Sequence, residues 1–289
     1  MWVAAKTGIW DEARSIPSRF VRKTILSVTL FYRMWRIDNR PLPHFLIIGA
    51  QKAGTSSLHI YLSQHPQILP GLRKEIHFFD LHYDKSLDWY RAHFPLAPDG
   101  CITGEASPFY LCHPHVPRRI SQTIPSVKLV ILLRNPVDRA ISHYFHAVRH
   151  KRENLPLEEA FRKEEQRIGP ELAKMQKDEF YNSDVYQRHS YKNRGIYVDQ
   201  LKAYSEYFDK EQMIILDSED FFHNSKESLK EVFSFLNVDM EFLPDDLSPK
   251  NIGGYDNEIV PKSAHQYLTE YFSPYNEELY EFLGRDLKW

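Results

Sequence analysis

The chain has 289 residues, 42 % of them hydrophobic and 26 % charged, with a formal net charge of −2. This composition is typical of one large globular domain or two small ones. The charge balance argues against a nucleic-acid binder, which is usually basic. The two cysteines, Cys101 and Cys112, are too few for a disulfide framework, and we expect free thiols. No cluster of metal-ligating residues is recognisable.

The N-terminal segment, residues 1–40, differs from the rest of the chain. Residues 14–40 include seven basic residues and one acidic residue, Asp38. Apolar residues recur there at helical spacing, at Val21, Ile25, Val28, Tyr32 and Trp35. Two interpretations stay open, a basic amphipathic helix that makes peripheral contact with an anionic membrane and a helix packed on the flank of the domain. No stretch approaches the roughly 20 apolar residues of a membrane span, and no signal-peptide cleavage pattern is clear, so we expect a cytoplasmic protein.

Residues 41–289 alternate between apolar runs and helical patterns. Short apolar runs at 45–48, 128–133 and 213–216 predict buried strands. Helices are predicted at 56–63, from Asn135 and Pro136 onward, and at 157–167, 196–208, 219–236 and 263–283, with a break at Pro274 left open. This alternation predicts an α/β domain with a central, mostly parallel sheet flanked by helices.

The strongest local signal is the loop after the first strand. Gly49 and Gly54 allow the backbone to turn tightly and to approach a ligand, and Lys52 lies between them. The hydroxyl residues Thr55, Ser56 and Ser57 then begin a helix, whose N-terminus attracts anions. We therefore predict a phosphate site, the alternative being a turn that needs glycine only for packing.

This loop differs from that of nucleoside triphosphatases. Their motif places a lysine directly after the second glycine, where this chain has Thr55. They also need an acidic residue that helps to hold Mg²⁺, commonly at the end of a second strand, whereas the strand at 128–133 is followed by Arg134. A cation there suits a second phosphate. The pattern therefore favours a nucleotide with two separate phosphate sites and no metal over a P-loop kinase.

Four stretches resemble the sulfotransferase superfamily, in particular its heparan sulfate branch of N- and 3-O-sulfotransferases. They stand in the family's order, and weaker similarity runs from about residue 43 to the C-terminus. The stretches are Ile48-Gly-Ala-Gln-Lys-Ala-Gly-Thr-Ser-Ser57, Lys74-Glu-Ile-His-Phe-Phe-Asp80, Gly104-Glu-Ala-Ser-Pro-Phe-Tyr110 and Leu133-Arg-Asn-Pro-Val-Asp-Arg-Ala-Ile-Ser-His-Tyr144. The resemblance implies a P-loop-like sulfotransferase fold over residues 41–289. It also implies transfer of a sulfuryl group from 3'-phosphoadenosine 5'-phosphosulfate (PAPS) to a hydroxyl or amine of a glycan.

The resemblance also assigns the co-substrate residues. The 5'-phosphosulfate would be held by the loop, and the 3'-phosphate by Arg134 and Ser142, where guanidinium and hydroxyl donors match phosphate geometry. Lys250, in a glycine-containing stretch that continues to Tyr255, would also contact a phosphate. The loop residues concerned are Lys52, Gly54, Thr55, Ser56 and Ser57.

The candidate base lies in the second stretch. If residues 74–80 are extended, Glu75 and His77 share one face and form an acid–base pair. By resemblance, Glu75 is the general base, His77 orients it or touches the acceptor, and Lys74 and Asp80 help to bind the acceptor. Without the family, an ion pair with a neighbouring cation is the simpler interpretation of Glu75. Lys52 would act in catalysis by stabilising the leaving phosphate oxygen.

One departure from the family bears on the acceptor. In 3-O-sulfotransferases a catalytic lysine follows the glutamate of the third stretch, whereas here Ala106 follows Glu105. The acceptor therefore stays open, and the alternatives are a lipid or a small metabolite. Outside this class, the alternatives are a P-loop nucleotide kinase and a degenerate nucleotide-binding scaffold without activity.

Overall fold

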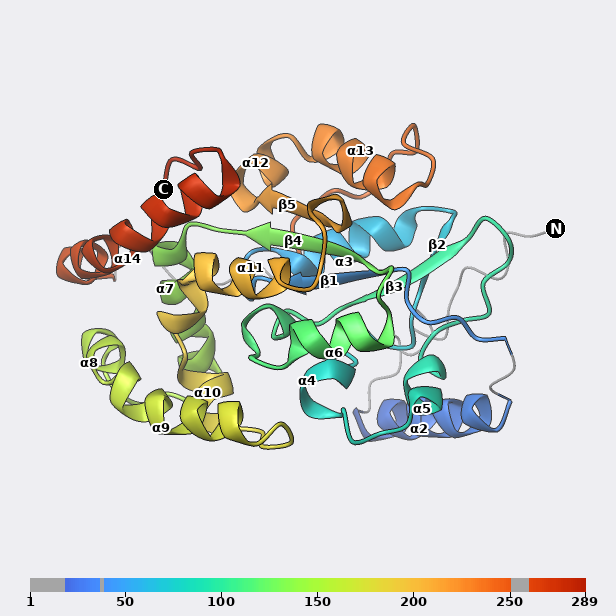
Figure 1. Cartoon of the computed structure of the whole chain (residues 1–289), viewed down its shortest axis with the longest axis horizontal. Helices are drawn as coiled ribbons and strands as arrows, with labels where there is room; N and C mark the ends of the chain where they lie inside the picture. Colours follow the sequence, from blue (N-terminus) through green and yellow to red (C-terminus); the bar gives the residue numbers. More distant parts are fainter. Residues whose placement is uncertain (1–18, 37–38, 251–259) are drawn as a thin grey trace.

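The computed structural model describes residues 19–36, 39–250 and 260–289, and its centre is a five-stranded parallel sheet (Figure 1). The strand order is β2-β3-β1-β4-β5, and every neighbouring pair is parallel. The predicted α/β class with its central parallel sheet is therefore confirmed. The strands are β1 (Phe45–Gly49), β2 (Ile68–Pro70), β3 (Ile102–Ala106), β4 (Lys128–Leu133) and β5 (Met213–Asp217).

The central strands β1 and β4 form because their sequences are apolar on both faces. All five residues of β1 are buried, as are the last five of β4, so helices must cover both sides of the sheet. Gly49 ends β1 where a larger residue would not fit, since a Cβ there would lie 2.6 Å from the side chain of Leu111. The two strands thereby bring the loop after Gly49 beside Arg134, which follows β4.

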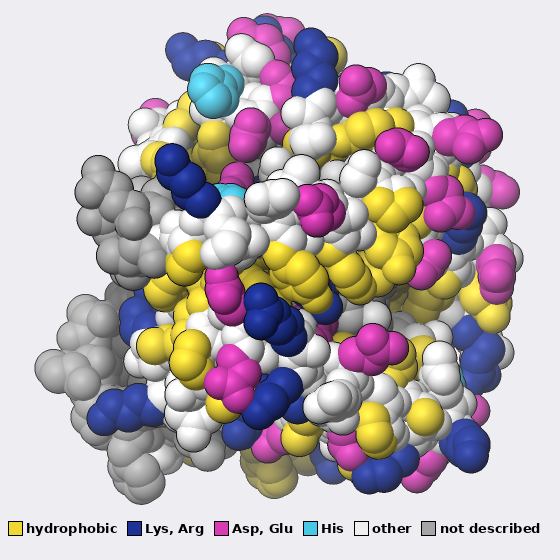
Figure 2. Space-filling model, turned by 90° about the vertical axis from the view of Figure 1, so that its left-hand side faces the viewer, with side chains coloured by type: hydrophobic (Ala, Val, Ile, Leu, Met, Phe, Trp, Pro, Cys, Tyr) yellow, Lys and Arg dark blue, Asp and Glu magenta, His cyan; other side chains and the backbone are white. Residues whose placement is uncertain are grey.

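Helices cover both sides of this sheet, with α12 and α13 on one side and α4 and α6 on the other (Figure 1). The helices are α2 (Arg19–Trp35), α3 (Thr55–Gln64), α4 (Phe78–Leu81), α5 (Leu87–Arg91), α6 (Val116–Thr123), α7 (Pro136–Arg149), α8 (Leu157–Arg162), α9 (Glu164–Lys177), α10 (Asp184–His189), α11 (Tyr197–Ser205), α12 (Ser218–His223), α13 (Ser225–Leu236) and α14 (Lys262–Leu283). Figure 2 shows the end of the molecule near α8 and α14, where a band of hydrophobic side chains lies between charged ones.

Two helix predictions need correction, and the open question at Pro274 is answered. The helix predicted at 157–167 is two helices, α8 and α9, which meet at Lys163. The helix predicted at 219–236 is also two, α12 and α13, separated by Asn224. In contrast, α14 runs through Pro274 without a break. The strands β2 and β3 had no prediction, because β2 has only three residues and β3 contains Gly104 and Glu105.

The N-terminal helix α2 packs beside α5 (Figure 1). The guanidinium groups of Arg33 and Arg40 both donate to the carbonyl oxygen of Phe94, at 3.3 and 2.8 Å. Within the described residues, no helix has the length and apolarity needed to cross a membrane. Cys101 and Cys112 are free thiols, as expected. The division at residues 40 and 41 stays a prediction.

Candidate active site

The loop between β1 and α3 has the backbone conformation of an anion cradle. Lys52 has φ 75° and Gly54 has φ 100°, both in the left-handed region. Glycine is required at 54, because a Cβ there would also meet the Phe222 ring at 2.7 Å. The loop delivers the chain directly into α3, which begins at Thr55, and the first N–H groups of that helix point out of its N-terminus.

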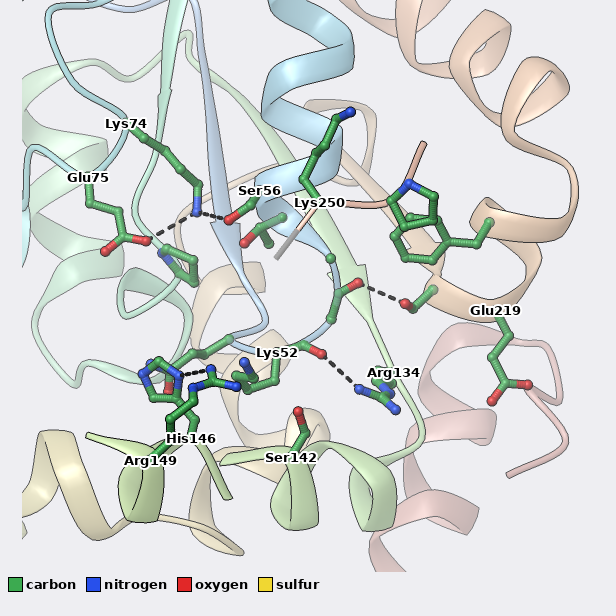
Figure 3. A pocket seen from close by; sticks show the side chains of 18 of the residues that line it. Lys52, Ser56, Lys74, Glu75, Arg134, Ser142, His146, Arg149, Glu219 and Lys250 are labelled. Atoms are coloured by element: carbon green, nitrogen blue, oxygen red, sulfur yellow. Dashed lines mark hydrogen bonds and ion pairs between the residues drawn. The ribbon is translucent and has the colours of Figure 1, made fainter. Parts of the chain in front are cut away.

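A cavity of about 1020 Å³ opens over this loop (Figure 3). It lies at the carboxyl ends of the parallel strands, the usual binding position in open α/β sheets. Segments distant in sequence meet there, among them the loop, the 74–75 stretch, Arg134 with helix α7, the start of α12 and residues 249–250. Of the site residues predicted from the sequence, those that line the cavity are Lys52, Gly54, Thr55, Ser56, Lys74, Glu75, Arg134, Ser142 and Lys250.

The cavity concentrates positive charge around Lys52. Burial lowers the pKa of Lys52 to about 8, and the charges that act on it, from Arg149, Arg134, Arg139 and Lys74, lower it in the same direction. Bringing cations together without an anion raises the free energy of each, so the arrangement favours a ligand with several negative charges.

Helix α7 supplies the far wall of this cation site. Arg134 precedes the helix and donates through Nη1 to the carbonyl oxygen of Lys52 at 3.2 Å, which joins the two predicted phosphate contacts. Ser142 points from α7 toward the cavity (Figure 3). His146 and Arg149 follow on the same helix, and Arg149 Nη2 lies 3.3 Å from His146 Nδ1. The helix therefore presents a row of nitrogen and hydroxyl groups to the ligand.

Lys74 connects the phosphate loop to the candidate base. Its ammonium donates to Ser56 Oγ at 2.9 Å and to Glu75 Oε1 at 3.1 Å (Figure 3). The sequence predicted Lys74 as an acceptor-binding residue. Lys74 therefore puts a positive charge between the hydroxyl of the loop and the carboxylate of Glu75.

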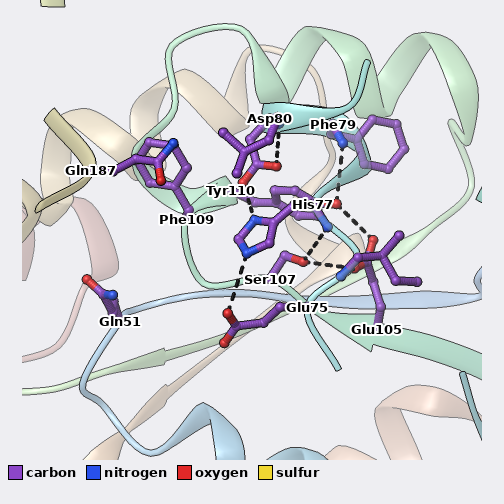
Figure 4. A network of polar contacts seen from close by, with 12 residues as sticks. Gln51, Glu75, His77, Phe79, Asp80, Glu105, Ser107, Phe109, Tyr110 and Gln187 are labelled. Atoms are coloured by element: carbon purple, nitrogen blue, oxygen red, sulfur yellow. Dashed lines mark hydrogen bonds and ion pairs between the residues drawn. The ribbon is translucent and has the colours of Figure 1, made fainter. Parts of the chain in front are cut away.

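Glu75, His77 and Asp80 form one line of polar contacts (Figure 4). His77 Nε2 lies 3.4 Å from Glu75 Oε2, and His77 Nδ1 lies 2.8 Å from Asp80 Oδ2. Burial alone would lower the pKa of His77, but the hydrogen bonds and charges of Asp80 and Glu75 raise it to about 10. His77 is thus a cation at neutral pH, held between two carboxylates.

Glu75 is ionised in this arrangement. Burial alone would raise the pKa of Glu75, but His77 and Lys74 outweigh it and lower the pKa to about 2. The Glu75 side chain is 47 % exposed and lines the cavity, so an acceptor can reach it. Asp80, in contrast, is buried and lies outside the cavity lining, where its contact is with His77.

The conformation of this stretch differs from the extended one considered from sequence. His77 has φ 59°, in the left-handed region, and α4 begins at Phe78. Glu75 and His77 still meet, because the turn at His77 folds its ring back toward Glu75. The predicted contact between Glu75 and His77 therefore exists, but it is formed by a turn and not by an extended strand.

Two predicted phosphate ligands have other partners. Ser57 is buried, and its hydroxyl accepts from the backbone N–H of Lys250 at 2.8 Å, so it anchors that segment beside the loop. The Lys250 ammonium binds Asp246 at 2.5 Å and points away from the loop (Figure 3). The glycine-containing part of that stretch, residues 251–255, lies outside the described residues.

Several lining residues were missed from the sequence. His146 and Arg149 could have been found by extending the helical face of Ser142 by four and seven residues. Burial and the charge of Lys52 lower the pKa of His146 to about 4. Phe222 and Ser218 come from α12, and no motif indicated them. Within residues 19–36, 39–250 and 260–289, no group of three or more His, Cys, Asp or Glu residues is placed to hold a metal ion.

The parallel sheet, the loop at Lys52 and the cavity with an ionised carboxylate at its edge form a site for an anionic ligand beside a proton acceptor. The sulfotransferase domain family matches residues 42–252, which is more than half of the chain. The chain therefore belongs to the sulfotransferase family, as the four sequence stretches indicated.

Individual relatives agree with this assignment. Heparan sulfate glucosamine 3-O-sulfotransferase 6 of Mus musculus is 30 % identical over 86 % of this chain and 74 % of its own length. Membrane-associated sulfotransferase kil1 of Dictyostelium discoideum is 27 % identical over 86 % of this chain, which spans 66 % of that relative. A sulfotransferase structure from Alicyclobacillus acidocaldarius superposes with a TM-score of 0.69 at 33 % identity, covering 85 % of this chain and 97 % of that one. These relatives confirm the resemblance to the heparan sulfate branch.

Proposed function

We propose that this sulfotransferase moves a sulfuryl group from PAPS to a hydroxyl or amine of a carbohydrate. The observation that carries the proposal is the cavity itself. A cluster of cations around Lys52 faces an ionised carboxylate, Glu75, and Lys74 lies between the two. This arrangement provides an anion site and a proton acceptor at the two ends of one transfer path.

The donor fits the two cationic parts of the cavity. The loop at Lys52 and the N-terminus of α3 suit the 5'-phosphosulfate, while Arg134 and Ser142 suit the 3'-phosphate. Phe222 contributes the phenyl ring among the lining residues and offers a stacking surface for adenine. The ammonium of Lys250 is engaged with Asp246, so we assign it no phosphate contact.

The reaction needs one proton transfer and one displacement. The acceptor oxygen or nitrogen attacks sulfur, and the bond between sulfur and the phosphate oxygen breaks, so the electron pair of that bond stays on the phosphate. Glu75 takes the acceptor proton, and Lys52 stabilises the charge that grows on the leaving oxygen. His77, a cation between Glu75 and Asp80, keeps the Glu75 carboxylate oriented.

Two observations bear on the acceptor. The heparan sulfate relatives favour a glycan, but Ala106 replaces the lysine that the 3-O-sulfotransferase branch carries there, and it is fully buried. We therefore propose a carbohydrate acceptor without the sulfation position of that branch. A lipid or a small metabolite is the alternative outcome of an acceptor screen.

Donor binding can be tested without knowing the acceptor. Calorimetry in excess EDTA should show that 3'-phosphoadenosine 5'-phosphate (PAP) binds more tightly than AMP or ATP, because only PAP has phosphates for both cationic sites. Strict dependence on Mg²⁺, or a preference for ATP, would favour the kinase alternative. Incubation with labelled PAPS and a panel of glycans, lipids and small alcohols would then identify the acceptor by mass spectrometry.

Helix α2 supports a peripheral membrane contact as part of this function. Val28, Phe31, Tyr32 and Trp35 recur at the spacing of one helical face, and all are exposed, Trp35 by 79 % and Phe31 by 76 %. The sequence of α2 has four basic residues and no acidic one. Aromatic rings beside positive charge suit the interface of an anionic bilayer. A relative of this chain, kil1, is described as membrane-associated.

We infer that α2 lies in the headgroup region of an anionic membrane. The double variant Phe31→Ser, Trp35→Ser should lose co-sedimentation with vesicles that contain phosphatidylserine. Phe180→Ser, which removes another exposed aromatic ring, should retain it. Equal binding of all three proteins, or equal binding to neutral vesicles, would contradict this orientation.

A further inference from the structure

A buried carboxylate lies directly behind the candidate base. Glu105, near the end of β3, is 1 % exposed and accepts four hydrogen bonds. Figure 4 shows its contacts with Ser107 and Tyr110. Burial raises the pKa of Glu105, and these hydrogen bonds oppose the rise. The donors are Ile76 N at 3.2 Å, Ser107 Oγ at 2.8 Å, Tyr90 Oη at 2.6 Å and Tyr110 Oη at 2.9 Å.

Three of these contacts lead to the backbone around Glu75. The N–H of Ile76 donates to Glu105 directly. Ser107 Oγ, which donates to Glu105, accepts from the N–H of His77 at 3.3 Å. Tyr110 Oη, which also donates to Glu105, accepts from the N–H of Phe79 at 3.3 Å. One carboxylate thus organises three amides of the segment that carries the base.

This segment needs such support because its geometry is unfavourable by itself. The φ of 59° at His77 is uncommon for a residue with a side chain, and it persists only where the surroundings hold it. The same turn sets the 3.4 Å contact between His77 and Glu75. If the amides are released, the segment can relax and the imidazole can separate from the carboxylate.

We propose that Glu105 is a positioning residue for catalysis, which holds the 75–79 segment so that His77 orients Glu75 toward the acceptor. The proposal rests on the proposed function of Glu75 as the base. Glu105 itself lies outside the cavity lining and touches no reacting atom. Its effect passes through Ile76, Ser107 and Tyr110, and should therefore appear in the rate of transfer and not in nucleotide binding.

Two isosteric variants separate positioning from general stability. Ser107→Ala and Tyr90→Phe each remove one hydrogen bond to Glu105, but only the Ser107 hydroxyl continues to the backbone of His77. Residues that orient metal ligands through hydrogen bonds typically change activity by 10- to 100-fold, and by analogy we expect Ser107→Ala to lower kcat by about 10-fold or more. Tyr90→Phe should lower kcat much less than Ser107→Ala does, because its hydroxyl makes no contact with the backbone of the 75–79 segment. Both should leave the Kd for PAP unchanged.

Variants of Glu105 itself show the largest loss of kcat that this network can cause. Glu105→Ala removes all four acceptor contacts and should lower kcat by about 100-fold if it folds. Glu105→Gln should fall between Glu105→Ala and the native chain, since its single amide oxygen can still serve Ile76 and Ser107. If Glu105→Ala does not fold, the comparison of Ser107→Ala with Tyr90→Phe decides the question alone.

A second measurement does not depend on activity. The imidazole of His77 can be followed by NMR during a pH titration, and its signal identified by its loss in His77→Gln. In Ser107→Ala the pKa of His77 should fall from about 10 toward its usual range, whereas in Tyr90→Phe it should stay raised. Equal kcat losses in the two variants, with an unchanged His77 titration, would overturn the positioning role.

The outcomes distinguish this inference from the proposed function. If Glu75→Gln abolishes transfer while Ser107→Ala and Glu105→Gln transfer normally, Glu75 is the base and Glu105 is only structural. If the native protein transfers no sulfuryl group from PAPS, the proposed function fails, and the NMR titration still shows whether Glu105 holds the segment.

Discussion

The low pKa of Lys52 makes nucleotide binding depend on pH in a defined direction. In the free protein, burial and neighbouring cations lower the pKa of Lys52 to about 8. A bound phosphate favours the charged ammonium, so PAP should raise this pKa and take up a proton. The affinity should therefore fall as the pH rises through 8.

The size of the effect follows from the fraction of charged lysine. With a pKa of about 8, about nine-tenths of the Lys52 side chains are protonated at pH 7 and about one-tenth at pH 9. If only the charged form binds PAP, the Kd should rise about tenfold between these pH values. At pH 8, binding should take up about half a proton. The phosphates contribute little, since their second pKa is about 6.

Isothermal calorimetry in buffers of different ionisation enthalpy measures this proton uptake directly. The control is Lys52→Arg, which keeps the charge but does not titrate in this range. It should bind PAP with no proton uptake from this position and with a nearly constant Kd from pH 7 to 9. A native Kd that is independent of pH, or the same pH dependence in Lys52→Arg, would refute the role of the cation cluster.

Three further predictions test individual residues. Arg134→Ala should weaken PAPS binding by about 1.5–3 kcal/mol, the usual contribution of a charge-assisted hydrogen bond. It should weaken the binding of adenosine 5'-phosphosulfate less, because that ligand lacks the 3'-phosphate. Equal losses of affinity for both ligands would mean that Arg134 has a structural role. Glu75→Gln should lower kcat by roughly 100-fold or more with little change in the Kd for PAP. Because the pKa of Glu75 is about 2, the native rate should not fall through protonation of this carboxylate between pH 4 and 8. Near-normal turnover of Glu75→Gln would exclude Glu75 as the base. Gly54→Ala should lower both the melting temperature and PAP affinity, whereas Gly100→Ala, also at a positive φ but in open space, should affect stability alone.

The sequence predicted the parts of the fold that rest on local chemistry. The apolar runs of β1 and β4, the glycines of the loop and the Asn135 cap of α7 all encode their structure within a few residues. The same locality placed Lys52 and Arg134 correctly after two strands, and the structure shows that these strands, β1 and β4, are neighbours. The family assignment depended on four such stretches and is confirmed by the domain match over residues 42–252.

The rest depended on contacts between distant segments. The strand β3 has no apolar periodicity, because it carries the buried Glu105. Of the four hydrogen-bond partners of Glu105, Ile76 and Tyr90 come from distant segments, while Ser107 and Tyr110 follow the strand. Ser57 follows the phosphate loop directly, yet it faces Lys250, almost two hundred positions along the chain. The side chains of Phe222 and Ser218 reach the cavity only because β5 lies beside β4. No local pattern carries that information.

Sulfuryl transfer itself is the most direct test of the account. The purified chain is incubated with PAPS that carries a labelled sulfur and with a heparan-type glycan in excess EDTA, and both products are measured. We predict labelled glycan and PAP in equal amounts, with both reduced strongly in Glu75→Gln. Transfer of phosphate from ATP in the presence of Mg²⁺, without any transfer from PAPS to any acceptor of the panel, would contradict it.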